Sequence, residues 1–109
     1  LAVNHVLPAR PTERDFKYWL AGEIIKRTGQ VVLKEIWLDV ERTSRIDLLL
    51  PESKIALELK LSNLHCSTDR LASQVDRYAS FLMEDGYDVV GVSLDGSIGI
   101  SAEEFLDQL

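Results

Sequence analysis

The sequence has little of what would build a disulfide, a zinc site or a membrane span. It contains one cysteine and two histidines in 109 residues, so Cys66 has no partner for an internal disulfide and a Cys/His zinc site is excluded. No apolar run approaches the ~20 residues that span a bilayer, and the start shows no signal-peptide pattern. We therefore expect an intracellular, cytoplasmic protein without a membrane-spanning segment.

Basic residues are missing from the last quarter of the chain. Residues 84–109 hold 7 Asp or Glu and no Lys or Arg, whereas residues 1–83 hold 12 basic and 11 acidic residues. The total charge of −6 argues against broad electrostatic attraction to nucleic acid. The nearly neutral first part still leaves room for a local basic face.

The length and the hydrophobic patterns indicate one domain of alternating helices and strands. With 109 residues, 46% of them hydrophobic, the chain is long enough for one core, and we predict a single domain over 1–109 with an irregular lead-in at 1–10. Apolar spacing predicts these elements in order: a helix at 13–28, strands at 31–40, 45–50 and 55–61, a helix at 67–83, strands at 88–94 and 98–100, and a final short helix.

Capping residues and short turns indicate how these elements are joined. Thr12 followed by Asp15 resembles a capping box, Gly29 is a helix stop, and Ser101 begins the last helix. The two strands within 45–61 form an antiparallel hairpin, and the strand after the second helix is expected to run parallel to a neighbour. The predicted fold class is therefore α/β, a mixed central sheet flanked by helices on both sides.

Charged residues interrupt the apolar hairpin. If Leu50 pairs with Ile55, Asp47 faces Glu58 across the two strands, and two opposed carboxylates repel each other. A divalent cation between them would remove the repulsion, and oxygen ligands around an open position suit Mg²⁺. Lys60 then lies one strand step away, where it would activate a water molecule or stabilise charge on a phosphate.

Two other interpretations of the hairpin charges stay open. A register slip of two residues would set Asp47 against Ala56 or Lys60 instead. Alternatively, Glu58 and Lys60 lie on a solvated sheet face, and Asp47 pairs with Lys60 or Arg45. In that case the charges have no catalytic meaning.

The order of these motifs resembles the PD-(D/E)xK nuclease superfamily. The resemblance rests on Asp47 followed by Glu58-Leu59-Lys60 on the next strand, and on Gln74-Val75-Asp76-Arg77-Tyr78 in the second helix. The second pattern is similar to the QxxxY motif of the RecB-like branch. The resemblance covers nearly the whole chain and implies a restriction-endonuclease-like αβββαβ core. The proline that often precedes the motif aspartate is absent, because Ile46 stands there.

The resemblance also implies a role for each motif residue. Asp47, Glu58 and the backbone carbonyl of Leu59 would bind Mg²⁺ or Mn²⁺, and Lys60 would position the attacking water. Gln74 and Tyr78, four apart on one helix face, would support the site or the substrate. All five side-chain positions belong to the expected catalytic set: Asp47, Glu58, Lys60, Gln74 and Tyr78.

Members of the family often carry one more carboxylate on the first helix. Glu13 and Glu23 are the candidates, and the expected return of the first strand favours Glu13 as a further metal ligand. An acid that stabilises the helix N-terminus is an equally good interpretation of Glu13. We expect Trp19 and Trp37 in the core rather than as platforms for nucleobases.

These features together predict a metal-dependent nuclease that hydrolyses phosphodiester bonds, an endodeoxyribonuclease in particular. DNA is favoured over RNA as the partner, and specificity would come from a homodimer or from fused domains. One rival is a catalytically inactive module of the same fold that binds nucleic acid or protein. Another is a small inhibitor-like domain whose acidic C-terminal quarter binds a basic protein.

Overall fold

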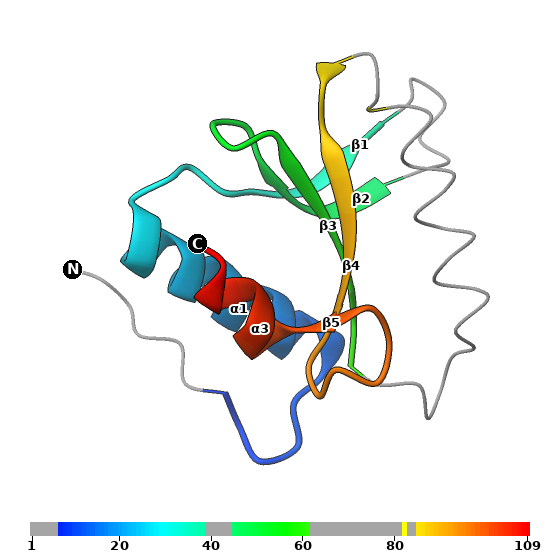
Figure 1. Cartoon of the computed structure of the whole chain (residues 1–109). Helices are drawn as coiled ribbons and strands as arrows, with labels where there is room; N and C mark the ends of the chain where they lie inside the picture. Colours follow the sequence, from blue (N-terminus) through cyan, green and yellow to red (C-terminus); the bar gives the residue numbers. More distant parts are fainter. Residues whose placement is uncertain (1–6, 39–44, 62–81, 83–84) are drawn as a thin grey trace.

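The described part of the computed structural model is a mixed five-stranded sheet with two helices (Figure 1). It comprises residues 7–38, 45–61, 82 and 85–109. The elements are α1 (Glu13–Thr28), β1 (Leu33–Trp37), β2 (Arg45–Leu50), β3 (Ile55–Lys60), β4 (Asp88–Ser93), β5 (Ile100–Ser101) and α3 (Ala102–Asp107). The α/β class predicted from the sequence is confirmed, and the predicted helix at 67–83 lies, apart from Leu82, outside the described residues.

The strands follow each other in the sheet in chain order, from β1 at one edge to β5 at the other. β1, β2 and β3 are antiparallel, whereas β4 runs parallel to β3, as a strand that follows a crossover is expected to do. Leu50 pairs with Ile55, and Leu48 pairs with Leu57. The hairpin register predicted from the sequence is therefore confirmed.

The predicted ends of α1 and the predicted start of α3 are also confirmed. The Thr12 hydroxyl accepts a hydrogen bond from the Asp15 N–H, and the Asp15 carboxylate accepts one from the Thr12 N–H, so the capping box is complete. Gly29 ends α1 with a left-handed φ of 70°. Ser101 caps α3 by accepting a hydrogen bond from the Glu104 N–H.

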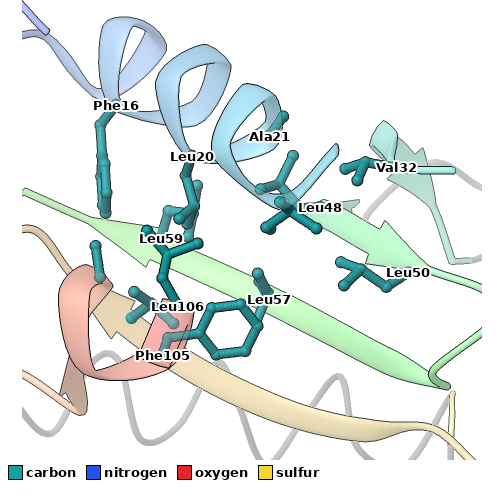
Figure 2. Packing of buried hydrophobic residues seen from close by; sticks show 13 residues of the cluster. Phe16, Leu20, Ala21, Val32, Leu48, Leu50, Leu57, Leu59, Phe105 and Leu106 are labelled. Carbon is teal, nitrogen blue, oxygen red and sulfur yellow. The ribbon is translucent and has the colours of Figure 1, made fainter. Parts of the chain in front are cut away.

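The main hydrophobic core lies between the sheet and the two described helices (Figure 2). Phe16 and Leu20 of α1 are fully buried against the apolar side chains of β2 and β3, and Phe105 of α3 packs into the same cluster. Figure 1 shows α1 and α3 next to each other on this side of the sheet.

A second, smaller cluster contains Ile46, Leu49, Ala56 and Leu82. Strict alternation along β2 would place Ile46 with Leu48, which belongs to the main core. The alternation of side chains between the two faces of the sheet is therefore interrupted at Asp47, which lies between Ile46 and Leu48. The Asp47 carboxylate accepts a hydrogen bond from the Leu59 N–H of β3. Leu82, at the end of the predicted second helix, contributes to this cluster. No described helix is long and apolar enough to cross a membrane.

The turn after β4 does not make a hairpin, although its Asp95-Gly96 pair is common in hairpins. β5 instead runs parallel to β4 after a short loop, in which Ile98 donates its N–H to the buried Ser93 hydroxyl. Gly99 in this loop lies close to the backbone of Gly91 in β4. A Cβ at Gly99 would lie 2.2 Å from the Gly91 carbonyl oxygen, so only glycine fits there without a shift of the backbone.

This contact predicts that Gly99→Ala lowers the free energy of unfolding by about 2 kcal/mol or more, from left-handed strain and the clash together. Gly29→Ala is the matched control, because Gly29 has a similar φ but nothing within 4 Å of an added Cβ. We expect it to cost about 1 kcal/mol. Urea unfolding measures both, and equal losses would contradict the proposed clash.

Candidate active site

Asp47 and Glu58 lie where the β2–β3 hairpin stops pairing through its backbone. The described pairing ends at Leu48 and Leu57, and the next contact is made by the Asp47 carboxylate. Its Oδ2 accepts a hydrogen bond of 2.8 Å from the Leu59 N–H. The N–H and C=O of a strand residue point to the same side, so the Leu59 carbonyl also faces Asp47.

Glu58 is a buried carboxylic acid next to this junction. Only 5% of the residue is exposed, and its Oε2 atom has no hydrogen-bond partner among the described residues. A buried polar atom without a partner is costly and rare in folded proteins. This oxygen of Glu58 therefore contributes no hydrogen bond to the described part of the fold.

The surroundings of Glu58 raise the pKa of its carboxyl group to about 8. Burial is the largest cause, and the nearby Asp47 carboxylate adds to it, while the Lys60 ammonium acts in the opposite direction. A hydrogen bond to Asp47 and the charge of Glu13 also favour the neutral form. Two carboxylates close together, one of them holding its proton, form a site that a divalent cation would stabilise in the ionised state.

These groups line an open cleft of about 370 Å³. Five of its seven lining residues are charged, and it brings together residues of α1, β1, β2 and β3. The lining residues are Glu13, Trp37, Arg45, Asp47, Glu58, Leu59 and Lys60. The tertiary structure thus gathers the helix carboxylate and the hairpin charges predicted from the sequence around one space.

Lys17 and Glu35 belong to the surroundings of the site, although the sequence analysis missed them. The Lys17 ammonium lies 2.8 Å from Glu35 Oε1 and 3.6 Å from Asp47 Oδ1. The Lys17 side chain is only 12% exposed. It lies one helical turn after Glu13, and this i, i+4 spacing was the available signal.

Glu35 reaches Lys17 from an irregular point of β1. It lies opposite Asp47, between the pairs Lys34–Leu48 and Ile36–Ile46, and has a φ of 57°. A left-handed φ in a non-glycine residue is uncommon within a strand and carries a cost. Its ion pair with Lys17 lowers the pKa of the Glu35 carboxyl group. The sequence contains no evident signal for this backbone conformation.

Other predicted residues lie at different distances from the cleft. Glu23 is not among the residues that line the cleft. Its Oε2 lies 3.7 Å from Nε of Arg27, one turn further along α1. Arg45 lines the cleft beside Asp47. Gln74 and Tyr78 lie outside the described residues.

The two tryptophans differ from each other in their surroundings. Trp19 stacks on Phe16 and packs against the main core, as predicted. The prediction that Trp37 is a core residue is wrong, because it is 43% exposed and lines the cleft. β1 is the edge strand of the sheet, so nothing pairs with its outer side among the described strands.

If a divalent cation such as Mg²⁺ binds in the cleft, Asp47 and Glu58 are the residues that would hold it. Among the described residues, no three His, Cys, Asp or Glu side chains converge closely enough to form a complete cage. Mg²⁺ is commonly held by one or two carboxylates, and water and substrate phosphates supply its other ligands. Asp47 and Glu58, with its unpartnered Oε2, form such a pair.

Comparisons of the chain with models of protein families, with curated proteins and with solved structures found no match. What the cleft does is therefore inferred from its own geometry and charge.

The raised pKa of Glu58 predicts a stability that depends on pH in metal-free protein. The carboxyl group binds its proton more tightly in the folded state, so its contribution is full below its ordinary pKa of 4.5 and is lost as pH rises through about 8. We expect a loss of roughly 1 kcal/mol or more between about pH 5 and pH 8, measured by urea unfolding in EDTA.

Glu58→Gln is the matched control for this pH dependence, because the amide keeps the size of the side chain and does not titrate. We expect its stability to vary less over the same range. A variant with the same pH profile as the wild type would show that another group causes the change.

The position of Lys17 predicts that Lys17→Met destabilises the fold. Without the ammonium, Glu35 and Asp47 face each other across β1 and β2 as like charges. We expect a loss of about 1 kcal/mol, partly recovered at high salt because screening weakens the repulsion. Lys17→Arg keeps the charge and should lose less. Thermal unfolding measures both, and a Met variant as stable as the wild type would disprove the bridging role.

Proposed function

We propose that this chain is a metal-dependent nuclease domain that hydrolyses phosphodiester bonds, DNA more than RNA. The observation that carries the proposal is the buried Glu58 carboxyl group, which has an unpartnered oxygen beside Asp47 in a cleft that Lys60 also lines. Two acids and a lysine around an open space are the groups that phosphodiester hydrolysis with Mg²⁺ or Mn²⁺ needs. A structural role for Glu58 does not explain its unpartnered oxygen.

The residues of the cleft divide the chemistry between them. Asp47, Glu58 and the Leu59 carbonyl would hold the cation, and Glu13 lies at the same cleft as a further carboxylate. When bound, the cation supplies Lewis-acid stabilisation of the phosphate charge. Glu58 would lose its proton to solvent when it holds the cation, and its raised pKa of about 8 would make this binding depend on pH. Lys60 orients the attacking water and stabilises the developing negative charge.

The topology supports the restriction-endonuclease-like fold as part of this proposal. A helix, an antiparallel three-stranded unit and a parallel fourth strand follow in the order that the resemblance to PD-(D/E)xK nucleases implies. Gln74 and Tyr78 would then assist the site or the substrate. A second copy of the chain or a fused domain would supply the surface for sequence selection.

The second candidate function is a catalytically inactive module of the same fold that binds nucleic acid or protein. One observation favours it: both carboxylate oxygens of Asp47 already have close neighbours within the protein, the Leu59 N–H and the Lys17 ammonium. In this interpretation Asp47 serves the hairpin and needs no cation. Metal binding separates the two candidates, because the inactive module gains no stability from Mg²⁺.

The test of the proposed function is cleavage of supercoiled DNA, linear DNA and single-stranded RNA with Mg²⁺ or Mn²⁺, compared with EDTA. We expect cutting that requires the cation and falls by about 100-fold or more in Lys60→Met, which loses the ammonium, and in Glu58→Gln. Lys26→Met, in the exposed last turn of α1, is the matched lysine control and should cut normally.

Two results would contradict the nuclease proposal. One is cutting that continues unchanged in folded Lys60→Met and Glu58→Gln proteins, because the activity would then come from another site or from a contaminant. The other is the absence of cutting together with a melting temperature that Mg²⁺ and Mn²⁺ leave unchanged.

A further inference from the structure

An arginine and a tryptophan form a cation–π pair at the cleft. The Arg45 guanidinium carbon lies 5.2 Å from the centre of the Trp37 ring. The two residues are direct partners across β1 and β2, and both line the cleft that contains Asp47 and Glu58. The pair is therefore fixed by the sheet itself, two residues along β2 from the proposed metal ligand Asp47.

Trp37 remains open to solvent in spite of this contact. It is 43% exposed, which makes it one of the few large apolar side chains at the surface of the described residues. An exposed tryptophan on an edge strand gains little for the fold compared with a buried one. In a cleft lined by charged groups, its indole ring is the one large flat surface, and such surfaces bind nucleobases by stacking.

A second group of basic and aromatic side chains lies on α1 and β1. Arg14 of α1 and Lys34 of β1 both lie 5.5 Å from the centre of the Tyr18 ring. Arg14 and Lys34 are exposed, and α1 and β1 are two of the four elements that contribute residues to the cleft. Basic side chains next to aromatic rings are characteristic of surfaces that bind single-stranded nucleic acid.

We infer that Trp37 and Arg45 form a stacking platform for a nucleobase of a single-stranded substrate, which holds the strand beside the catalytic cleft. This inference rests on the proposed nuclease function and names its substrate class. The indole ring stacks on the base, and Arg45 neutralises a neighbouring phosphate. Bases inside a duplex already stack on each other and cannot reach the ring without being flipped out. Single strands, overhangs and frayed ends are therefore the preferred substrates.

The experiment measures binding of a short fluorescent single-stranded oligothymidylate, and of a duplex, in EDTA so that no cutting occurs. We expect Trp37→Ala to weaken single-strand binding by about tenfold, the usual effect of losing one stacked base, and to change duplex binding much less. Arg45→Ala should weaken both and reduce the salt dependence, since it removes a phosphate contact. Circular dichroism confirms that each variant is folded.

The two tryptophans of the chain provide a second, direct readout. In the Trp19→Phe variant Trp37 is the sole tryptophan, and saturating unlabelled oligothymidylate should quench its fluorescence. In Trp37→Phe the sole emitter is Trp19, which packs against the core, and its emission should stay unchanged. Quenching of Trp37 alone would show that the base contacts this ring.

The stacking platform is disproved if Trp37 emission does not change with bound oligothymidylate, if Trp37→Ala binds the single strand as tightly as the wild type, or if the wild type binds only duplex. These results are separate from the cleavage assay. Cutting that persists without a role for Trp37 would remove the platform and leave the nuclease function. Single-strand binding through Trp37 without metal-dependent cutting would support the platform and favour the inactive binding module.

Discussion

The hydrogen bond between the Asp47 carboxylate and the Leu59 N–H is the contact on which the candidate site depends. At 2.8 Å it replaces the backbone pairing of β2 and β3 beyond Leu48 and Leu57. The side chain thereby opens the end of the hairpin without leaving the Leu59 N–H unsatisfied. It also fixes the carboxylate beside Glu58 and next to the Leu59 carbonyl. Because the Asp47 side chain, and not the β2 backbone, binds the Leu59 N–H, this one hydrogen bond shapes the end of the hairpin at the cleft and holds the Asp47 carboxylate there.

This arrangement places like charges close together, and the protein offsets them in two ways. Lys17 lies between Asp47 and Glu35, so the two acids of neighbouring strands share one ammonium group. For Glu58, burial raises the pKa of the carboxyl group to about 8, and the opposing effect of the Lys60 ammonium does not cancel this rise. The pair is consequently asymmetric: Asp47 is supported by protein donors, whereas Glu58 keeps an unpartnered oxygen. This asymmetry is the reason that we propose Glu58 as a ligand of a cation taken up from solution.

The overall charge of −6 conceals a division between the two parts of the chain. The acidic residues after residue 83 include those of β4, of the loop that follows and of α3, whereas the cleft is bordered by α1 and the hairpin. Arg14, Lys34 and Arg45 are exposed around the aromatic rings near this cleft. Net charge alone therefore describes the surface around the cleft poorly, because a charged partner responds to the local field at the surface that it approaches.

The sequence by itself determined the features that arise between residues close in the chain. These are the bounds of α1, from Thr12 and Gly29, and the hairpin register, from its turn; this register brings Asp47 near Glu58. These follow from caps, turns and alternation, which act over a few residues. Only the tertiary structure decided that Trp37 is exposed, that Lys17 reaches Asp47, and that Glu35 adopts a left-handed φ. Each of these depends on how α1 and the edge strand β1 lie against the hairpin, and long-range packing of this kind has no signal in local periodicity.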